Sequence, residues 1–301
     1  MILCCGEALI DMLPRKTAAG ENAFAPHTGG SVFNTAVALG RLDAPVQFFS
    51  GLSSDLFGDM LRAQLAASHV DSGPAAVADR PTTLAFVTLT DGHASYAFYD
   101  ENTAGRMLSE ADLPKTEADA LFFGGISLVV EPCGAAYEAL MLREAPHRLT
   151  MIDPNIRPSF ITDEAAYRAR LTRMMGCAGI IKTSDEDLAW IVGDADANAL
   201  LASTGAQVIL LTRGGEGVSI VTASGTYDVP AEKADVVDTV GAGDTFSAGF
   251  LAQLHKSGHL TKDGITQATE ADLRAAAAFG AKVAAITVSR AGANPPWAAE
   301  L

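Results

Sequence analysis

The sequence lacks the features that identify several large classes of protein. Its 301 residues contain no run of about 18 apolar residues, the length that a transmembrane helix needs. The first residues carry Glu7 and Asp11 but no basic leader, so we expect no secretory signal peptide. Glycine and proline, with 28 and 13 residues, follow no triplet period, which excludes a collagen-like chain.

Cysteine is scarce. The four cysteines are Cys4, Cys5, Cys133 and Cys177, and no CxxC spacing occurs among them. Two adjacent cysteines make a poor disulfide framework. A reducing, cytoplasmic compartment is therefore the expected location.

Positive charge is scarce as well. Lys and Arg number 21 against 36 Asp and Glu, which gives a net charge of −15. Nucleic-acid-binding proteins usually carry a basic patch, so we expect neither nucleic acid nor a membrane as a partner. An anionic ligand would have to be held by a local group of donors, because the overall field repels it.

Three common motifs are also missing. No GxxxxGK[ST] sequence occurs, which excludes a P-loop. No GxGxxG follows the first apolar run, which argues against a dinucleotide site. No GxSxG is present, which disfavours a serine hydrolase.

What is present indicates a globular α/β chain. Hydrophobic residues make up 49% and charged residues 19% of the sequence, and no repeat or linker divides it, so residues 1–301 are predicted to form one domain. Short apolar runs predict strands at residues 2–5, 46–49, 120–123, 150–152, 179–182 and 208–212. Helices are predicted at residues 31–42, 57–67, 132–143, 164–175 and 185–192. This alternation indicates a doubly wound, mainly parallel sheet flanked by helices.

One segment breaks the alternation. Residues 82–100 contain two β-rich runs around Asp91 and Gly92, a pattern typical of a hairpin. Together with a first segment near the amino terminus, this hairpin is predicted to form a small β lid, from about residues 12–28 and 82–103. An ordinary edge hairpin is the alternative.

The most informative stretch is DTVGAGDTFSAGF at residues 238–250. A glycine-rich turn at 241–243 opens into a helix, so its backbone N–H groups can point at a bound anion. Asp244 lies in the first turn of that helix. From the residues alone, it is either an acid that favours a helix N-terminus or the base of a phosphoryl transfer.

This stretch closely resembles the C-terminal signature of the ribokinase-like (PfkB) family of carbohydrate kinases. GGSVFN at residues 29–34 resembles the family's N-terminal sugar-binding motif. GEALIDM, DPNIRP, IKTSDEDL, LTRGGEG and ITVSRAGA occur in the family's order along essentially the whole chain. The resemblance implies a ribokinase-like fold with a small β lid.

The resemblance also implies a role for each matching residue. Asp244 would be the catalytic base, and the N–H groups of Gly241, Ala242 and Gly243 would form the anion hole. The residues expected to bind the sugar are Asp11, Gly29, Gly30, Asn34, Phe98 and Arg157. Arg157 would clamp a substrate carboxylate, serve the phosphates of ATP or lie on the surface.

The nucleotide and metal sites are implied in the same way. The residues expected to bind ATP are Lys182, Ser184, Thr212, Gly214, Gly215, Gly217 and Ala281. Many relatives carry Asn at the positions of Ser184 and Ala281, so those two contacts differ here. Asp187 would help to organise Mg²⁺ through water, or is a solvated helix acid. A monovalent-cation loop would comprise Asp238, Val240, Thr287, Arg290 and Gly292.

The implied function is that of an ATP-dependent sugar kinase. DPNIRP and KTSDED are most similar to fructokinases, so phosphorylation of fructose to fructose 6-phosphate is the expected reaction, with Mg²⁺ and K⁺ as cofactors. They are also similar to 2-keto-3-deoxygluconate kinases, which gives one alternative. A non-catalytic sugar- or nucleotide-binding regulator is another, although the intact Asp244 argues against it. The lid is expected to form a homodimer.

Overall fold

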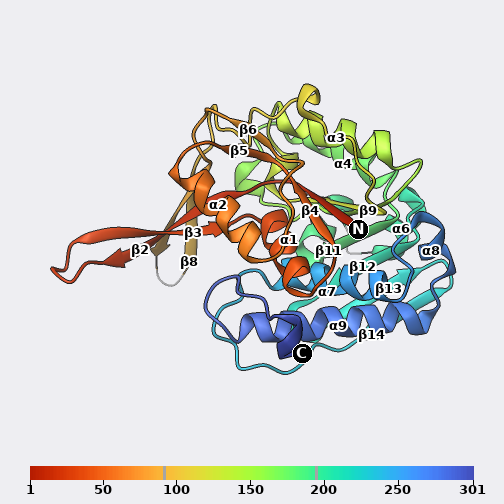
Figure 1. Cartoon of the computed structure of the whole chain (residues 1–301). Coiled ribbons are helices and arrows are strands. Elements are labelled where there is room, and N and C mark those ends of the chain that lie inside the picture. Colours follow the sequence, from red (N-terminus) through yellow and green to blue (C-terminus); the bar gives the residue numbers. More distant parts are fainter. Residues whose placement is uncertain (91–92, 194–195) are drawn as a thin grey trace.

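An eight-stranded sheet lies at the centre of the structure, a computed structural model that describes residues 1–90, 93–193 and 196–301. The strand order is β14-β13-β12-β11-β10-β9-β1-β4 (Figure 1). The strands are β1 (Ile2–Cys5), β4 (Val46–Phe49), β9 (Ala120–Gly124), β10 (Leu149–Asp153), β11 (Ile180–Ser184), β12 (Val208–Thr212), β13 (Val218–Thr222) and β14 (Gly225–Val229). The first six pair in parallel, which confirms the predicted mainly parallel sheet.

Helices cover both faces of this sheet. One face carries α1 (Ser31–Arg41), α2 (Leu56–Ala67), α7 (Ala242–Lys256), α8 (Lys262–Gln267) and α9 (Glu270–Val288). The other carries α3 (Cys133–Glu144), α4 (Glu164–Met175), α5 (Asp185–Val192) and α6 (Ala197–Thr204). The five predicted helices are confirmed within one or two residues at each end. Among the described residues, no helix combines the length and apolarity that crossing a membrane requires.

The apolar runs in the sequence reflect burial on both faces of the sheet. In β1, Ile2 and Cys4 pack into the core under α1 and α7, whereas Leu3 and Cys5 pack into the core under α3 and α4. A strand buried on both faces gives a continuous apolar run. β13 and β14 pair antiparallel at the edge and were not predicted. The alternating exposed residues of β14 give a weaker hydrophobic signal.

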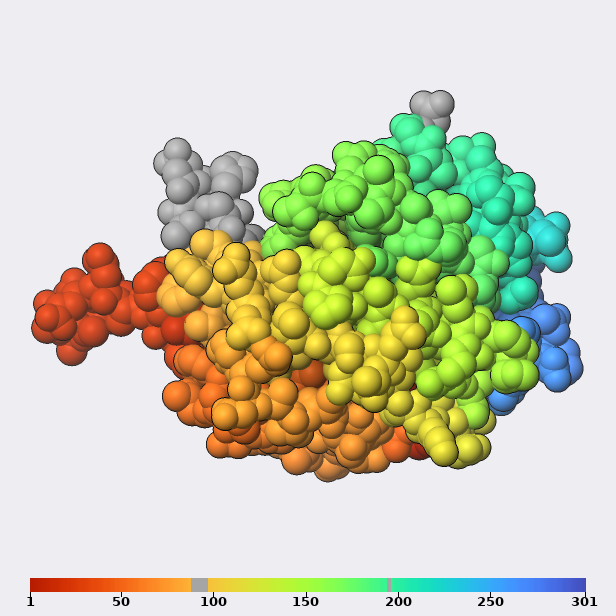
Figure 2. All heavy atoms as spheres, turned by 90° about the horizontal axis from the view of Figure 1, so that it is seen from above, coloured from red at the N-terminus to blue at the C-terminus, as the bar shows by residue number. Residues whose placement is uncertain are grey.

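A separate four-stranded sheet has the order β3-β2-β7-β8. Its strands are β2 (Leu9–Lys16), β3 (Asn22–Gly29), β7 (Leu84–Thr90) and β8 (His93–Tyr99). The β2–β3 hairpin projects far from the body (Figures 1 and 2). The two predicted lid segments therefore form one sheet, which begins at Leu9 and ends at Tyr99; the expected turn at Asp91 and Gly92 lies outside the described residues. A small parallel pair, β5 (Gly51–Ser53) and β6 (Ala76–Ala78), lies near it.

Side-chain alternation divides the four-stranded sheet into two faces. Ala85 pairs with both Asp11 and Phe98, so these three residues share one face. Phe86 belongs to the opposite face and packs against Phe24 and Tyr99, with ring centroids 5.0 and 5.4 Å apart. The first face turns toward the cavity described next.

Candidate active site

A cavity of about 350 Å³ lies where the carboxyl ends of the parallel strands meet the four-stranded sheet and the N-termini of α1 and α7. Ligands of open α/β sheets bind at this edge. Eleven of the predicted site residues line the cavity: Asp11, Gly30, Asn34, Phe98, Arg157, Lys182, Val240, Gly241, Ala242, Gly243 and Asp244. The fold thus brings the predicted catalytic and sugar-binding residues to one place.

Asp244 lies in the first turn of α7 and is only 8% exposed. Its Oδ1 accepts a hydrogen bond from the Ser31 hydroxyl and its Oδ2 accepts one from Nδ2 of Asn34, both 2.9 Å long. Burial raises the pKa of Asp244 to about 6, although the two donors oppose this shift. A carboxylate with a pKa near neutrality suits general-base chemistry.

The glycine turn in front of Asp244 has the conformation that an anion site needs. Gly241 has a left-handed φ of 79°, and a Cβ there would lie 2.7 Å from Cβ of Ala293. A Cβ on Gly243 would lie 3.0 Å from Nζ of Lys182, so the ammonium group is next to the turn. Backbone N–H groups, the N-terminus of α7 and this cation all favour negative charge in the same place.

Lys182 forms a buried ion pair. Its Nζ lies 2.8 Å from Oδ2 of Asp153 at the end of β10, and both side chains are nearly inaccessible. Burial lowers the pKa of Lys182, but Asp153, Asp187 and Asp244 outweigh burial and leave this pKa raised. Lys182 therefore stays charged, and its ammonium group lies next to the glycine turn.

The residues predicted to bind the sugar come from β2, the end of β3 and the start of α1. Burial raises the pKa of Asp11 to about 6. A Cβ on Gly29 would lie 2.2 Å from Oδ2 of Asp11, so only glycine leaves room for this carboxylate. Gly30 has φ 109° and is the N-cap residue of α1. Asn34 follows one turn later in α1, and its side-chain amide donates to Asp244.

Two further predicted residues close the cavity from the side. The ring of Phe98 packs edge-on against Phe160, with centroids 3.9 Å apart, and so joins the four-stranded sheet to the loop after β10. Arg157 in that loop is exposed, and its Nη1 donates to the carbonyl of Ile156 at 3.0 Å. Its guanidinium keeps further donors for a ligand.

The other predicted nucleotide residues lie outside the cavity lining, along the ends of β11 and β12. Ser184 and Thr212 are register partners, and Ser184 caps α5 by accepting from the N–H of Asp187 at 3.0 Å. Gly214 and Gly215 face open space. The remaining two predicted residues are Gly217, with φ 107°, and Ala281, which is buried in α9.

Several of the residues predicted to bind metal ions form hydrogen bonds within the protein. Oδ1 of Asp187 accepts from the N–H of Ile156 at 3.1 Å, and burial raises the pKa of Asp187. Oδ1 and Oδ2 of Asp238 accept from the N–H groups of Val240 and Gly292. Thr287 is buried and its carbonyl accepts from the N–H of Arg290. Within the described ranges, no three His, Cys, Asp or Glu side chains are grouped so that they could hold a metal ion.

Three residues of the site were missed by the sequence reasoning: Ser31, Glu7 and Asp153. Ser31 follows the GG pair, Glu7 belongs to GEALIDM and Asp153 opens DPNIRP, so each lies in a quoted motif. Nothing local marked them, because their partners are distant in the sequence. Asp153 also keeps one buried oxygen, Oδ1, without a hydrogen-bond partner.

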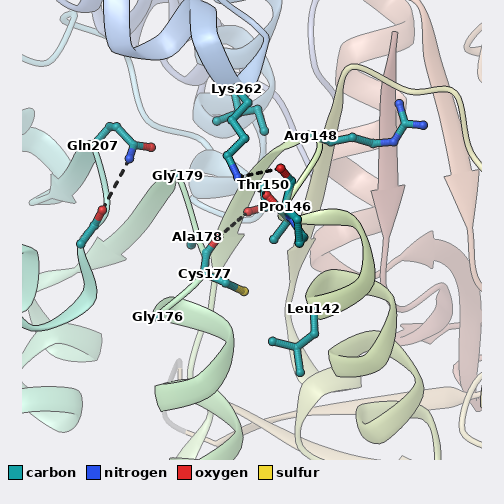
Figure 3. A pocket seen from close by; sticks show the side chains of 13 residues that line it. Leu142, Pro146, Arg148, Thr150, Gly176, Cys177, Ala178, Gly179, Gln207 and Lys262 are labelled. Carbon is teal, nitrogen blue, oxygen red and sulfur yellow. Dashed lines mark hydrogen bonds between the residues drawn. The ribbon is translucent and has the colours of Figure 1, made fainter.

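A second cavity, of about 360 Å³, lies at the opposite edge of the sheet (Figure 3). It is lined by loops that precede β10, β11 and β12. Nζ of Lys262 donates there to the carbonyls of Ala145 and Pro146 at 2.6 and 3.1 Å, and Arg148 donates to Glu144 and to two carbonyls. Both cations are thus already paired, and none of the predicted site residues lines this cavity.

The chain is similar to known carbohydrate kinases over nearly its whole length. The profile of the pfkB family of carbohydrate kinases matches residues 1–300. A fructokinase of Rhizobium leguminosarum bv. trifolii is 52% identical over 279 residues, covering 91% of this chain and 86% of its own. Fructokinase-1 of rice (Oryza sativa subsp. japonica) is 31% identical and covers 100% and 95%. The structure of a Xylella fastidiosa fructokinase with bound ATP superposes with a TM-score of 0.87, 29% identity and coverage of 97% and 93%.

Proposed function

This chain belongs to the pfkB family of carbohydrate kinases, and from that premise we propose that it transfers the γ-phosphoryl group of ATP to the 6-hydroxyl of fructose. The products would be fructose 6-phosphate and ADP. The observation that carries the proposal is the placement of Asp244 between the glycine turn and the sugar-side residues Asp11 and Asn34 in one cavity. The fructokinase named at 52% identity supports fructose as the substrate.

In the proposed step, Asp244 accepts the proton of the 6-hydroxyl while that oxygen attacks the γ-phosphorus. The bond from the γ-phosphorus to the bridging oxygen breaks, and ADP leaves with the electron pair. The N–H groups of Gly241, Ala242 and Gly243, with the ammonium of Lys182, stabilise the charge on the transferring group. Asp153 keeps Lys182 oriented and charged. The hydrogen bonds on Asp244 and the Lys182–Asp153 ion pair support the roles of these side chains.

The sugar is proposed to lie between the two walls of the cavity. Asp11 and Asn34 offer an acceptor and a mixed donor–acceptor group, which suit the hydroxyls of a neutral sugar. Gly29 and Gly30 let the backbone approach, and Phe98 covers the sugar. A carboxylate substrate would be repelled by Asp11 unless Arg157 offset the charge. Phosphorylation of 2-keto-3-deoxygluconate is therefore the second candidate, favoured by the position of Arg157 on the cavity wall.

ATP is proposed to extend from the glycine turn along the ends of β11 and β12. Ser184, Thr212, Gly214, Gly215, Gly217 and Ala281 would border it. The ATP bound in the Xylella relative supports ATP as the nucleotide. Mg²⁺ bound to the phosphates would neutralise their charge, with Asp187 as an outer ligand through water. The unpartnered Oδ1 of Asp153 is a second acceptor that fits such a shell. Asp238, Val240, Thr287, Arg290 and Gly292 would form the K⁺ loop.

We also propose that the four-stranded sheet is both a lid and a dimer surface. The face that carries Asp11 and Phe98 borders the cavity, which leaves the other face for a partner. That face holds the row of Phe24, Phe86 and Tyr99, of which Phe24 is 43% and Tyr99 62% exposed. A second copy of the sheet would bury these rings.

The test is the Asp244→Asn variant in an ADP-release assay with fructose, ribose, 2-keto-3-deoxygluconate and nucleosides. Asparagine cannot accept the proton, so we expect kcat to fall by about 10²–10⁴-fold, with sugar and ATP binding retained in calorimetry. Activity within threefold of wild type would remove Asp244 from the mechanism. A wild-type protein that binds fructose but transfers no phosphoryl group would indicate a regulator.

Arg157→Ala separates the two substrates. If fructose is the substrate, this variant leaves the ranking of sugars unchanged. If 2-keto-3-deoxygluconate exceeds fructose tenfold in kcat/KM, and Arg157→Ala removes that advantage, the fructose assignment is wrong and Arg157 is a carboxylate clamp.

A further inference from the structure

The first turns of α1 and α7 face each other, and hydrogen bonds join them. The Ser31 hydroxyl donates to Oδ1 of Asp244 at 2.9 Å, across 213 residues of sequence. The Thr35 hydroxyl lies 3.1 Å from the carbonyl oxygen of Ser31 and 3.2 Å from that of Asp244. The carboxylate of Asp244 is thus oriented mainly from α1, not from its own helix.

Ser31 is itself fixed by a buried carboxylate. Glu7 is 8% exposed, and its Oε1 accepts from the N–H of Ser31 at 2.8 Å. Its Oε2 accepts from the N–H of Ser127 at 3.4 Å. Glycines flank this group closely: a Cβ on Gly30 would lie 2.8 Å from the carbonyl oxygen of Glu7, and one on Gly125 would lie 2.1 Å from its Oε1. Glu7 therefore has little freedom, and it fixes the backbone from which Ser31 reaches Asp244.

The two donors on Asp244 are not equivalent. Asn34 is proposed to bind the sugar, so its amide has two partners to serve when substrate is present. Ser31 has no such second task in the proposed mechanism. A donor to the charged carboxylate also offsets part of the effect of burial, which favours the protonated acid.

We propose that Ser31 is a positioning residue for phosphoryl transfer, which holds Oδ1 of Asp244 through its hydroxyl while Glu7 fixes its backbone. The proposal rests on the proposed role of Asp244 as the base. The Ser31 hydroxyl contacts the proposed base, so its proposed action is through the orientation and proton affinity of Asp244.

Ser31→Ala removes the hydroxyl at little risk to the fold, because alanine is the most favourable residue in a helix. Loss of a hydrogen bond to a charged group corresponds to a loss of kcat on the order of 10- to 100-fold. The KM values for fructose and ATP should change much less. The acidic limb of the kcat–pH profile should move to higher pH, because Asp244 loses a donor to its charged form. Ser31→Thr keeps a hydroxyl and should restore both kcat and the pH profile.

Ser257→Ala is the matched control, since this hydroxyl lies at the far end of α7 and donates to a backbone carbonyl at 3.2 Å. It should match wild type in every measurement, with thermal midpoints recorded for all variants. A Ser31→Ala protein with wild-type kcat and pH profile would overturn the proposal. Equal losses in Ser31→Ala and Ser31→Thr would do so as well, because the hydroxyl would then be irrelevant.

The Asp244→Asn variant distinguishes the two failures. If Asp244→Asn is inactive while Ser31→Ala behaves as wild type, only the role of Ser31 is wrong. If Asp244→Asn remains active, the base itself is misassigned.

Discussion

At the level of single residues, the acids of the site are held where water stabilises their charge poorly. Asp244 and Asp11 both have a pKa raised to about 6, and burial is the main cause in each. Such a group disfavours the folded state whenever it is ionised, so function here opposes stability.

The pH dependence of this effect can be tested with Asp244→Asn. The ordinary pKa of 3.8 applies to the unfolded chain, and the value of about 6 to the folded one. Below pH 3.8 both states are protonated and the destabilisation is absent; it grows as the pH rises from there to 6 and is complete above 6. Asparagine removes it, so we expect the variant to be more stable at pH 8, by up to about 3 kcal/mol, and equal to wild type near pH 4.

Thermal unfolding at the two pH values measures this difference as a shift of the midpoint by several degrees. The exposed Asp235→Asn serves as the control, which should leave the midpoint unchanged at both. A variant that is less stable than wild type at pH 8 would contradict the account of burial.

At the level of elements, α7 carries the glycine turn, and its position depends on contact with α9. A Cβ on Gly249 would lie 2.7 Å from Cα of Gly280, and a Cβ on Gly280 would lie 2.7 Å from the carbonyl oxygen of Phe246. The two helices can approach this closely only through glycine.

Gly280→Ala should therefore push α7 away from α9. We expect a loss of about 1–3 kcal/mol in the free energy of unfolding, as for other overpacked cores, measured by urea denaturation. A lower kcat should accompany it, because the turn at 241–243 moves with α7. Gly258→Ala is unsuitable as a control, since Gly258 has φ 79°. Alanine has a higher helix propensity than glycine, so a loss of stability in Gly280→Ala would come from overpacking and not from propensity.

The four-stranded sheet gives the second prediction at this scale. If it closes over bound sugar, saturating fructose should slow amide hydrogen exchange in β2 and β3, because closure excludes water from the cavity. Mass spectrometry of peptides measures the exchange rate. β14, an edge strand of the eight-stranded sheet, serves as the internal reference. Unchanged exchange in β2 and β3 would show that the sheet does not act as a lid.

At the level of the whole molecule, a net charge of −15 surrounds a cavity that is proposed to bind the phosphates of ATP. The local donors at 241–243 and Lys182 must outweigh that field, which is consistent with a helix N-terminus and a buried cation at one point. The aromatic row of Phe24, Phe86 and Tyr99, on the outer face of the four-stranded sheet, is the proposed dimer surface.

Phe24→Asp should disrupt the proposed dimer. A charge at one end of the aromatic row opposes its burial, so sedimentation velocity should show a monomer for the variant and a dimer for wild type. Val77→Asp, at another exposed apolar position (60% exposed), is the control and should remain dimeric. A wild-type monomer at micromolar concentration would refute the dimer.

The sequence by itself determined the parallel strands, the five predicted helices and the two glycine motifs. Each of these depends on local information: a run buried on both faces is apolar throughout, and a glycine turn before a helix is visible in consecutive residues. Family resemblance then brought Asp11, Asn34 and Asp244 together as one site, and the structure lines one cavity with all three.

Only the tertiary structure decided which groups bond to which. Ser31 and Asn34 lie more than 200 residues from Asp244, and Asp153 lies 29 residues from Lys182. Lys182 was expected among the nucleotide residues, and only the fold shows that its ammonium group lies next to the glycine turn. Burial also depends on packing, so the raised pKa of Asp11 and Asp244 cannot be read from residue type. Hydrogen bonds and desolvation act between neighbours in space, and the chain order does not encode those neighbours locally.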